Sequence, residues 1–219
     1  MKYIIGIIII LCTTSCSSVV IPQNVRVGSI KEIELVITNE TIIDLNIFAG
    51  NAHLENISNE QLRAEMTAEC PSRNDECAER MADLDFVSLL KGKYLTLSTN
   101  RDSFFQHYNA TLNVKLFVPK SQQLNINMDA GELRVSNIDS CLKVDMSAGE
   151  ININMPYSMM ASVNLDTSFG EVSLMVNGLD QNENRAWLVG GEINWNQGIG
   201  SCQMKVDLQA GEISVNIAD

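Results

Sequence analysis

The sequence predicts an all-β protein: a single-domain β-solenoid with coils of roughly 20 residues and a small helical insertion. Three observations carry this prediction. A Gly-Glu pair recurs five times in the second half of the chain, the glycines are almost evenly spaced, and apolar and polar residues alternate on both sides of each pair. A sustained period near 20 residues is typical of solenoids, in which each coil packs on its neighbours.

Each repeat places an apolar residue directly after its Gly-Glu pair. The glycines are Gly131, Gly149, Gly170, Gly191 and Gly211, with spacings of 18, 21, 21 and 20 residues. In the second repeat Leu142, Val144 and Met146 alternate with polar residues before the corner, as Ile151 and Ile153 do after it. This period of two predicts strands with one inward face. Glycine at the corner permits positive φ or close approach between stacked coils.

These features resemble a known family. The strand Leu112–Pro119, with its Val-Pro ending, and the apolar alternation of 124–127 precede the Gly-Glu repeats. Together they are similar to the toast-rack, or adhesin-type, β-strand-repeat domains of unknown function. The resemblance covers 109–219 well and extends weakly to 25–57, where Gly50-Asn51 copies the corner. It implies a β-solenoid and an envelope location, and no reaction.

The N-terminus has the pattern of an export signal. A basic start and the short apolar run 3–11 are followed by Thr14-Ser15-Cys16, which resembles a bacterial lipobox. We expect residues 1–15 to be removed, Cys16 to be lipidated, 16–24 to form a linker and 25–219 to fold. Ser17 is similar to the residue found after the cysteine in outer-membrane lipoproteins, so the expected partner is the membrane, through a lipid anchor. An ordinary cleaved signal peptide is the alternative.

Export permits disulfides. Cys70 and Cys77 lie close together in a polar stretch, and we expect a bridge between them. Cys141 and Cys202 begin equivalent strands three coils apart if the coils stack in chain order. About 14 Å would then separate them, against the ~7 Å that a disulfide tolerates. We therefore expect no bond between Cys141 and Cys202.

An insertion at about 58–108 interrupts the pattern. Ser58-Asn59-Glu60-Gln61 fits a helix-capping box, and Leu62 and Met66 share a helical face. Asp75 can start a second short helix, whereas 94–98 reads as a strand. We expect 58–90 to be mostly helical, either as a surface embellishment or as a partner-binding element.

Candidate chemistry is sparse. The net charge of −12 argues against nucleic acid as a partner. His53 and His107 are far apart in sequence, and no familiar catalytic or phosphate-binding motif occurs, so we expect no enzyme, no resident metal and no cofactor. If the coils stack in register, the repeat carboxylates form a ladder of solvated residues, with a weak cation or cationic-partner site and catalysis as the alternatives. The members would be Glu132, Glu150, Glu171, Glu192 and Glu212.

The two tryptophans have different expected roles. Trp195 falls in the inward column. Trp187 falls outward near Arg185, which suits a glycan or partner contact, unless Trp187 folds over the sheet edge. The resulting hypothesis is a non-enzymatic envelope lipoprotein that binds or scaffolds an envelope protein or glycan. A polysaccharide-binding or polysaccharide-active protein is the alternative.

The last strand, 213–217, has neither proline nor lysine to block edge pairing. We expect its edge to be covered by a second copy, giving a homo-oligomer, or by the insertion folding back.

Overall fold

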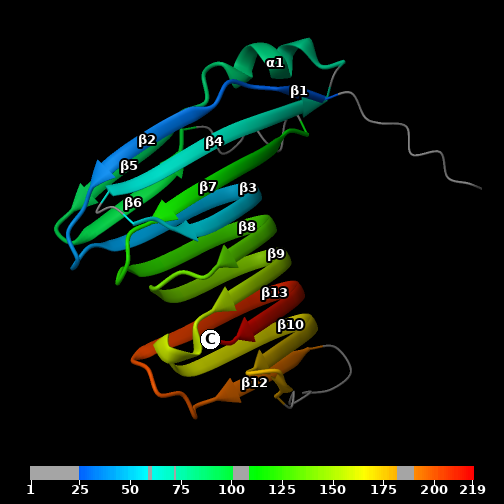
Figure 1. Ribbon diagram of the computed structural model, residues 1–219. Coiled ribbons are helices and arrows are strands. Elements are labelled where there is room, and N and C mark those ends of the chain that lie inside the picture. The colour runs from blue at the N-terminus through cyan, green and yellow to red at the C-terminus, as the bar shows by residue number, and fades with distance from the viewer. Residues whose placement is uncertain (1–24, 59–60, 72, 101–108, 182–189) are drawn as a thin grey trace, which may run out of the picture.

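The computed structural model describes residues 25–58, 61–71, 73–100, 109–181 and 190–219. Within these residues the chain forms one mixed sheet of 13 strands and one α-helix (Figure 1). The all-β solenoid class predicted from the repeats is therefore confirmed.

Five long strands form the repeating part of the stack, and each of them curves through a glycine (Figure 1). We call the residues before the glycine the first limb and those after it the second limb; in the strand that holds Gly131 these are 123–130 and 132–136. The five strands are β3 (Ile42–Asn56), β8 (Gln123–Ser136), β9 (Cys141–Met155), β10 (Met160–Val176) and β13 (Cys202–Ile217).

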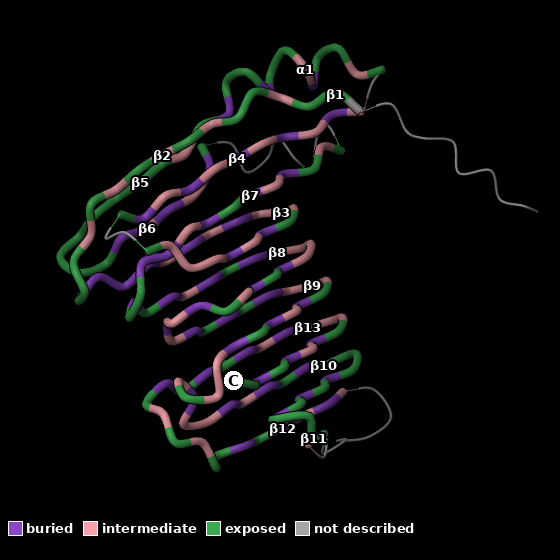
Figure 2. The backbone as a smooth tube through the Cα atoms, in the orientation of Figure 1, coloured by how far each residue is buried: buried purple, intermediate pink, exposed green. Residues whose placement is uncertain are grey.

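Alternate residues of both limbs are buried, and they form one continuous apolar core along the stack (Figure 2). In β9 the buried residues are Leu142, Val144 and Met146 before the corner and Ile151 and Ile153 after it. The residues between them point outward. The period-two reading of the repeats therefore describes the observed faces.

The stack does not follow the chain. β13 lies between β9 and β10, in parallel register with both: Gly211 pairs with Gly149 on one side and with Gly170 on the other. The order of the long strands is therefore β3, β8, β9, β13, β10. The expectation that Cys141 and Cys202 are unbonded is wrong, because adjacent strands bring them to a Cα separation of 5.1 Å and a disulfide joins them.

The same arrangement shows that the expectation for the edge of the strand 213–217 is wrong. Neither a second copy of the chain nor the insertion covers this edge. Ile213–Ile217 pairs with β9 and with the second limb of β10, so neither a second copy nor the insertion is needed to cover it. The last repeat is an internal strand of the sheet.

Smaller strands and a helix close the N-terminal end of the stack. β6 (Tyr94–Thr99) pairs with the first limb of β3, and β7 (Thr111–Val118) pairs with its second limb. β5 (Phe86–Lys91) continues the sheet from β6, and β4 (Gln61–Pro71) continues it from β7. β1, β2 and helix α1 complete this end, which we call the cap. They span Val25–Val27, Lys31–Val36 and Asp75–Met81.

The prediction that 58–90 is mostly helical is wrong, because Gln61–Pro71 and Phe86–Lys91 are strands and, among the described residues, only Asp75–Met81 is an α-helix. The residues from Leu62 to Cys70 form a strand in which every second side chain is buried, because β4 packs on the core. The expected short helix from Asp75 is present, and the Asn74 side chain caps it by accepting a hydrogen bond from the Cys77 backbone N–H. Cys70 and Cys77 are joined by a disulfide, which ties α1 to the end of β4.

β12 (Gly191–Trp195) lies at the other end of the stack and pairs antiparallel with the first limb of β10. The strand of the fourth Gly-Glu repeat begins at Gly191 and, among the described residues, pairs with β10 alone. Trp195 is buried, as the inward register predicts, but it lies opposite Val163 rather than on a second limb. The short elements η1 (Tyr157–Met159) and β11 (Leu179–Asp180) flank this end.

Candidate interaction surface

Two columns of carboxylates run along the outside of the stack, one on each limb. The first is the glutamate ladder directly after the glycine corners. The register places Glu132 beside Glu150, Glu150 beside Glu212, and Glu212 beside Glu171. Neighbouring strands are about 4.8 Å apart. The structure thus brings together four of the five predicted ladder residues.

Glu192 does not join the ladder, because β12 runs antiparallel on the first limb of β10. It lies opposite Asp166 instead. Glu192 is the last member of a second column, which we call the acidic column. This column consists of one carboxylate from each of four consecutive strands: Asp145, Asp207, Asp166 and Glu192. Sequence reasoning missed this column because Asp207 lies between Asp145 and Asp166 only when β13 lies between β9 and β10, and Glu192 faces Asp166 only because β12 is antiparallel.

Basic side chains offset part of this charge. Arg134 donates a hydrogen bond to Glu132 at 2.5 Å, and this bond, with the negative charge of Glu132, raises the pKa of Arg134. Lys205 donates to Asp207 at 2.6 Å, which raises the pKa of Lys205, and the charges of Asp145 and Asp166 raise it further. Both cations are exposed, so these pairs contribute little to stability. They set the charge pattern of the surface.

Amides form similar contacts between the strands. The Asn127 side chain donates to Asn46 at 2.9 Å and that of Asn125 donates to Asp44 at 2.6 Å. Asn51 donates to Asn113 at 2.8 Å on the opposite limb. Side-chain hydrogen bonds therefore join the polar outer faces of β3, β7 and β8 from strand to strand.

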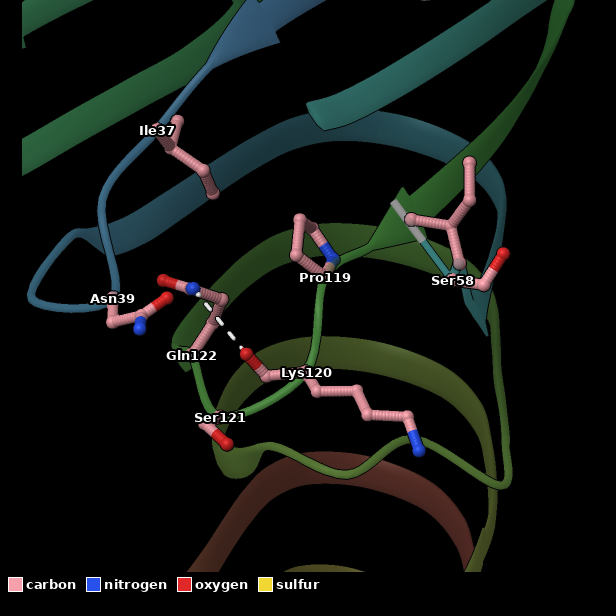
Figure 3. Close-up of a pocket in the computed structure, with 8 residues that line it drawn as sticks. Ile37, Asn39, Ser58, Pro119, Lys120, Ser121 and Gln122 are labelled. Carbon is pink, nitrogen blue, oxygen red and sulfur yellow. Dashed lines mark hydrogen bonds between the residues drawn. The ribbon is translucent and has the colours of Figure 1, made fainter. Parts of the chain in front are cut away.

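A small polar pocket lies beside the turn after β7 (Figure 3). It has a volume of about 240 Å³ and is lined by residues from three turns, Ile37, Asn39, Ile57, Ser58, Pro119, Lys120, Ser121 and Gln122. Gln122 is 2% exposed and its Nε2 donates to the carbonyl of Lys120, whereas its Oε1 has no hydrogen-bond partner. A buried carbonyl oxygen favours a hydroxyl or water donor in this space.

The remaining candidates are scattered or lie outside the described residues. His53 is partly buried and contacts Ser136 and Glu55 at 3.3 Å. No group of three or more histidine, cysteine or acidic side chains with metal-binding geometry occurs in the described part of the chain. Cys16, His107, Arg185 and Trp187 lie outside it.

The chain belongs to the Toastrack DUF4097 family, whose model matches residues 24–216. The resemblance read from the Gly-Glu repeats is thereby confirmed. No curated protein matches the sequence.

Several solved structures are similar to this chain. A "putative cell adhesion protein" from Clostridium sporogenes ATCC 15579 has 13% sequence identity and a TM-score of 0.45, over 87% of this chain and 99% of that one. A "putative adhesin" from Bacteroides fragilis NCTC 9343 has 8% identity and a TM-score of 0.26, over 87% and 97% of the two chains. The family assignment rests on the family model.

The two disulfides point to folding in an oxidising, extracytoplasmic compartment. Among the residues that the structure describes, no helix is both long enough and apolar enough to cross a bilayer.

Proposed function

We propose that this protein is a non-enzymatic outer-membrane lipoprotein that is tethered through Cys16 and binds a basic envelope protein on the outer face of its stack. The observation that carries the proposal is the acidic column. Four carboxylates on consecutive strands form a rigid, extended negative surface on a packed core, and Asp145 and Asp166 are exposed. Such a surface complements a partner that presents lysine or arginine at similar spacing.

The tether is supported by the short apolar run before Thr14-Ser15-Cys16 and by the disulfides of an exported fold. Palmitate labelling in cells tests it directly. We expect the wild-type chain to be labelled and the Cys16→Ala variant to be unlabelled. Equal labelling of the two chains would contradict lipidation at Cys16.

Photocrosslinking in intact cells tests the binding surface. A photoreactive residue in place of exposed Gln209, two positions after Asp207, should capture an envelope protein that mass spectrometry can identify. The same residue in place of Ile199, exposed in a turn outside the column, is the matched control. Asp145→Asn with Asp207→Asn should greatly reduce capture at position 209. Capture that is equal at both positions, or unchanged by the Asn pair, argues against this surface.

The pocket beside Gln122 favours a second candidate, the binding of a glycan. Its volume and its unpartnered buried oxygen suit a sugar hydroxyl. A glycan array followed by calorimetry tests this function, and Gln122→Met, which removes the acceptor at similar volume, should abolish the signal. A turnover assay on any glycan that binds separates binding from hydrolysis.

A further inference from the structure

The β5–β6 hairpin at the cap, residues 86–99, exposes apolar side chains that the fold does not use. The outer face of its sheet carries Val87 (45% exposed), Leu89 (62%) and Tyr94 (46%). Leu90, on the opposite face, is also 62% exposed and lines a cavity of about 200 Å³ between β2 and β5. In a folded domain, apolar residues exposed on both faces of one edge strand indicate contact with something else.

Exposed apolar residues gather at the two ends of the stack, and most of those in the described residues lie at the cap end. At that end they are Val27, Ile30, Val36, Val87, Leu89, Leu90 and Tyr94. The sides of the stack are polar. The cap therefore differs in chemistry from the surface proposed above to bind a protein.

The charge of the hairpin also differs from that of the chain. Residues 86–99 contain two lysines, Lys91 and Lys93, on either side of the turn, and no acidic residue, although the whole protein carries a net charge of −12. Lys93 lies over the Tyr94 ring, 5.6 Å from its centroid. Leucine, tyrosine and lysine together at a hairpin tip are typical of segments that lie at a membrane surface.

Neighbouring elements bring a few acids near the hairpin. Glu32 and Glu34 point outward on β2, and Asp44 lies two strands from Leu89 on the same face, where Asn125 donates to it at 2.6 Å. None of them belongs to the hairpin. The two lysines thus form a local basic tip that complements anionic lipid headgroups.

A second copy of the chain is a poorer occupant. Pairing two hairpins would bring four lysines together, and the carboxylate columns of another copy offer no apolar partner for Leu89 or Leu90. A bilayer offers anionic headgroups for the lysines and acyl chains for the leucines.

We propose that the β5–β6 hairpin rests in the headgroup region of the bilayer to which Cys16 tethers the chain. This inference rests on the proposed lipid anchor. Residues 16–24 are nine residues, which span at most roughly 30 Å when extended, so a lipid on Cys16 holds Val25, where β1 begins in the cap, within that distance of the membrane. The stack then points away from the bilayer, with its carboxylate columns free for a partner.

The test uses the full-length lipidated protein, reconstituted in phosphatidylcholine vesicles with and without phosphatidylglycerol. A Leu89→Cys variant carries an environment-sensitive fluorophore. Position 89 is exposed, and the label reacts there selectively because the four domain cysteines are paired. We expect the emission to shift to shorter wavelength and to be quenched by lipids brominated in their acyl chains. Ile199→Cys, labelled in the same way, should stay water-like. Lys91→Gln with Lys93→Gln should reduce the shift in the phosphatidylglycerol vesicles.

Each outcome bears on one proposal. A water-like signal at position 89, with lipid on Cys16 confirmed by mass spectrometry, overturns the hairpin inference and leaves the anchor intact. A blue shift at position 89 that appears without vesicles and grows with protein concentration shows that a second copy covers the hairpin, which also overturns the inference. A chain without lipid on Cys16 overturns the proposed anchor. It overturns the hairpin inference as well, because that inference places the hairpin in the bilayer to which Cys16 is tethered.

Discussion

A Cβ atom added to Gly170 would lie closer than 3.0 Å to the carbonyl oxygen of Gly211 on the neighbouring coil. Gly211 stands in the same relation to Gly149, and Gly149 to Gly131. The corners of the coils are thus packed backbone on backbone, with no room for a side chain. This relation, rather than φ alone, explains why the corner residue is glycine.

We predict that Gly211→Ala lowers the free energy of unfolding by about 3 kcal/mol or more, because it adds a steric clash to the cost of a positive φ. The control is Gly178→Ala, whose φ of +77° is also positive but whose Cβ would meet nothing within 4 Å. This control should cost about 1–2 kcal/mol. Urea unfolding measures both, and equal losses would contradict the packing argument.

Removing the Cys141–Cys202 bridge should cost more than removing the Cys70–Cys77 bridge. In the chain-entropy model the bridge between residues 61 apart is worth about 4 kcal/mol, and the bridge between residues 7 apart about 2.5 kcal/mol. The paired Cys→Ser variants, compared by urea unfolding, test this order. Peptide mapping of the unreduced protein should recover both bridges, and a free Cys202 thiol there would refute the strand order.

Repulsion between the like charges of the acidic column should lower the free energy of unfolding. Two charges about 4.8 Å apart in water repel by a little under ~1 kcal/mol, so Asp166→Asn should stabilise the fold by up to that amount at low ionic strength. The gain should shrink as salt is added. Asp129→Asn, an exposed position outside the column, is the control and should show no such salt-dependent gain. A gain that does not change with salt would show that repulsion is not its cause.

Lys205 should titrate above its ordinary value of 10.5, because it donates a hydrogen bond to Asp207 and lies near further carboxylates. Its raised pKa means that this pair stabilises the fold fully below pH 10.5 and that the contribution is lost as pH rises through the folded-state pKa. NMR titration of the side chain measures this pKa. Asp207→Asn should lower it more than Asp145→Asn does, and the reverse order would contradict the assigned contact.

The faces of the strands could be predicted from the sequence, whereas their order could not. Alternation around each Gly-Glu pair identifies buried residues such as Ile151 and Val215 because strand geometry is local. The repeats are too alike for their patterns to say which lies beside which. Only one feature of the sequence indicates the observed order: Cys141 and Cys202 both stand at the start of equivalent strands in an exported chain. The assumption that coils stack in chain order excluded a disulfide between them and therefore led to the wrong order.

Two further errors have a different cause, strand pairing that a single segment does not reveal. Glu192 was expected in the glutamate ladder because it follows a glycine, but β12 pairs antiparallel and turns it toward Asp166. In β4 the small residues Ala64 and Ala68 are buried in alternation with polar ones, a weak period-two signal beside the helical spacing of Leu62 and Met66. The residues around Glu192 and within β4 could not have corrected either error, because the strand with which each segment pairs determines its structure.

Because β13 lies between β9 and β10, a strand that follows β10 in the chain is inserted between two strands that precede it. The stack therefore cannot be assembled coil by coil in chain order, since β10 has no long-strand neighbour until the 16 residues of β13 have been synthesised. Nor can β13 be removed to give a shorter stack, because its loss would leave a strand-wide gap between β9 and β10. Gain or loss of a coil during evolution would thus have to leave β9, β13 and β10 together.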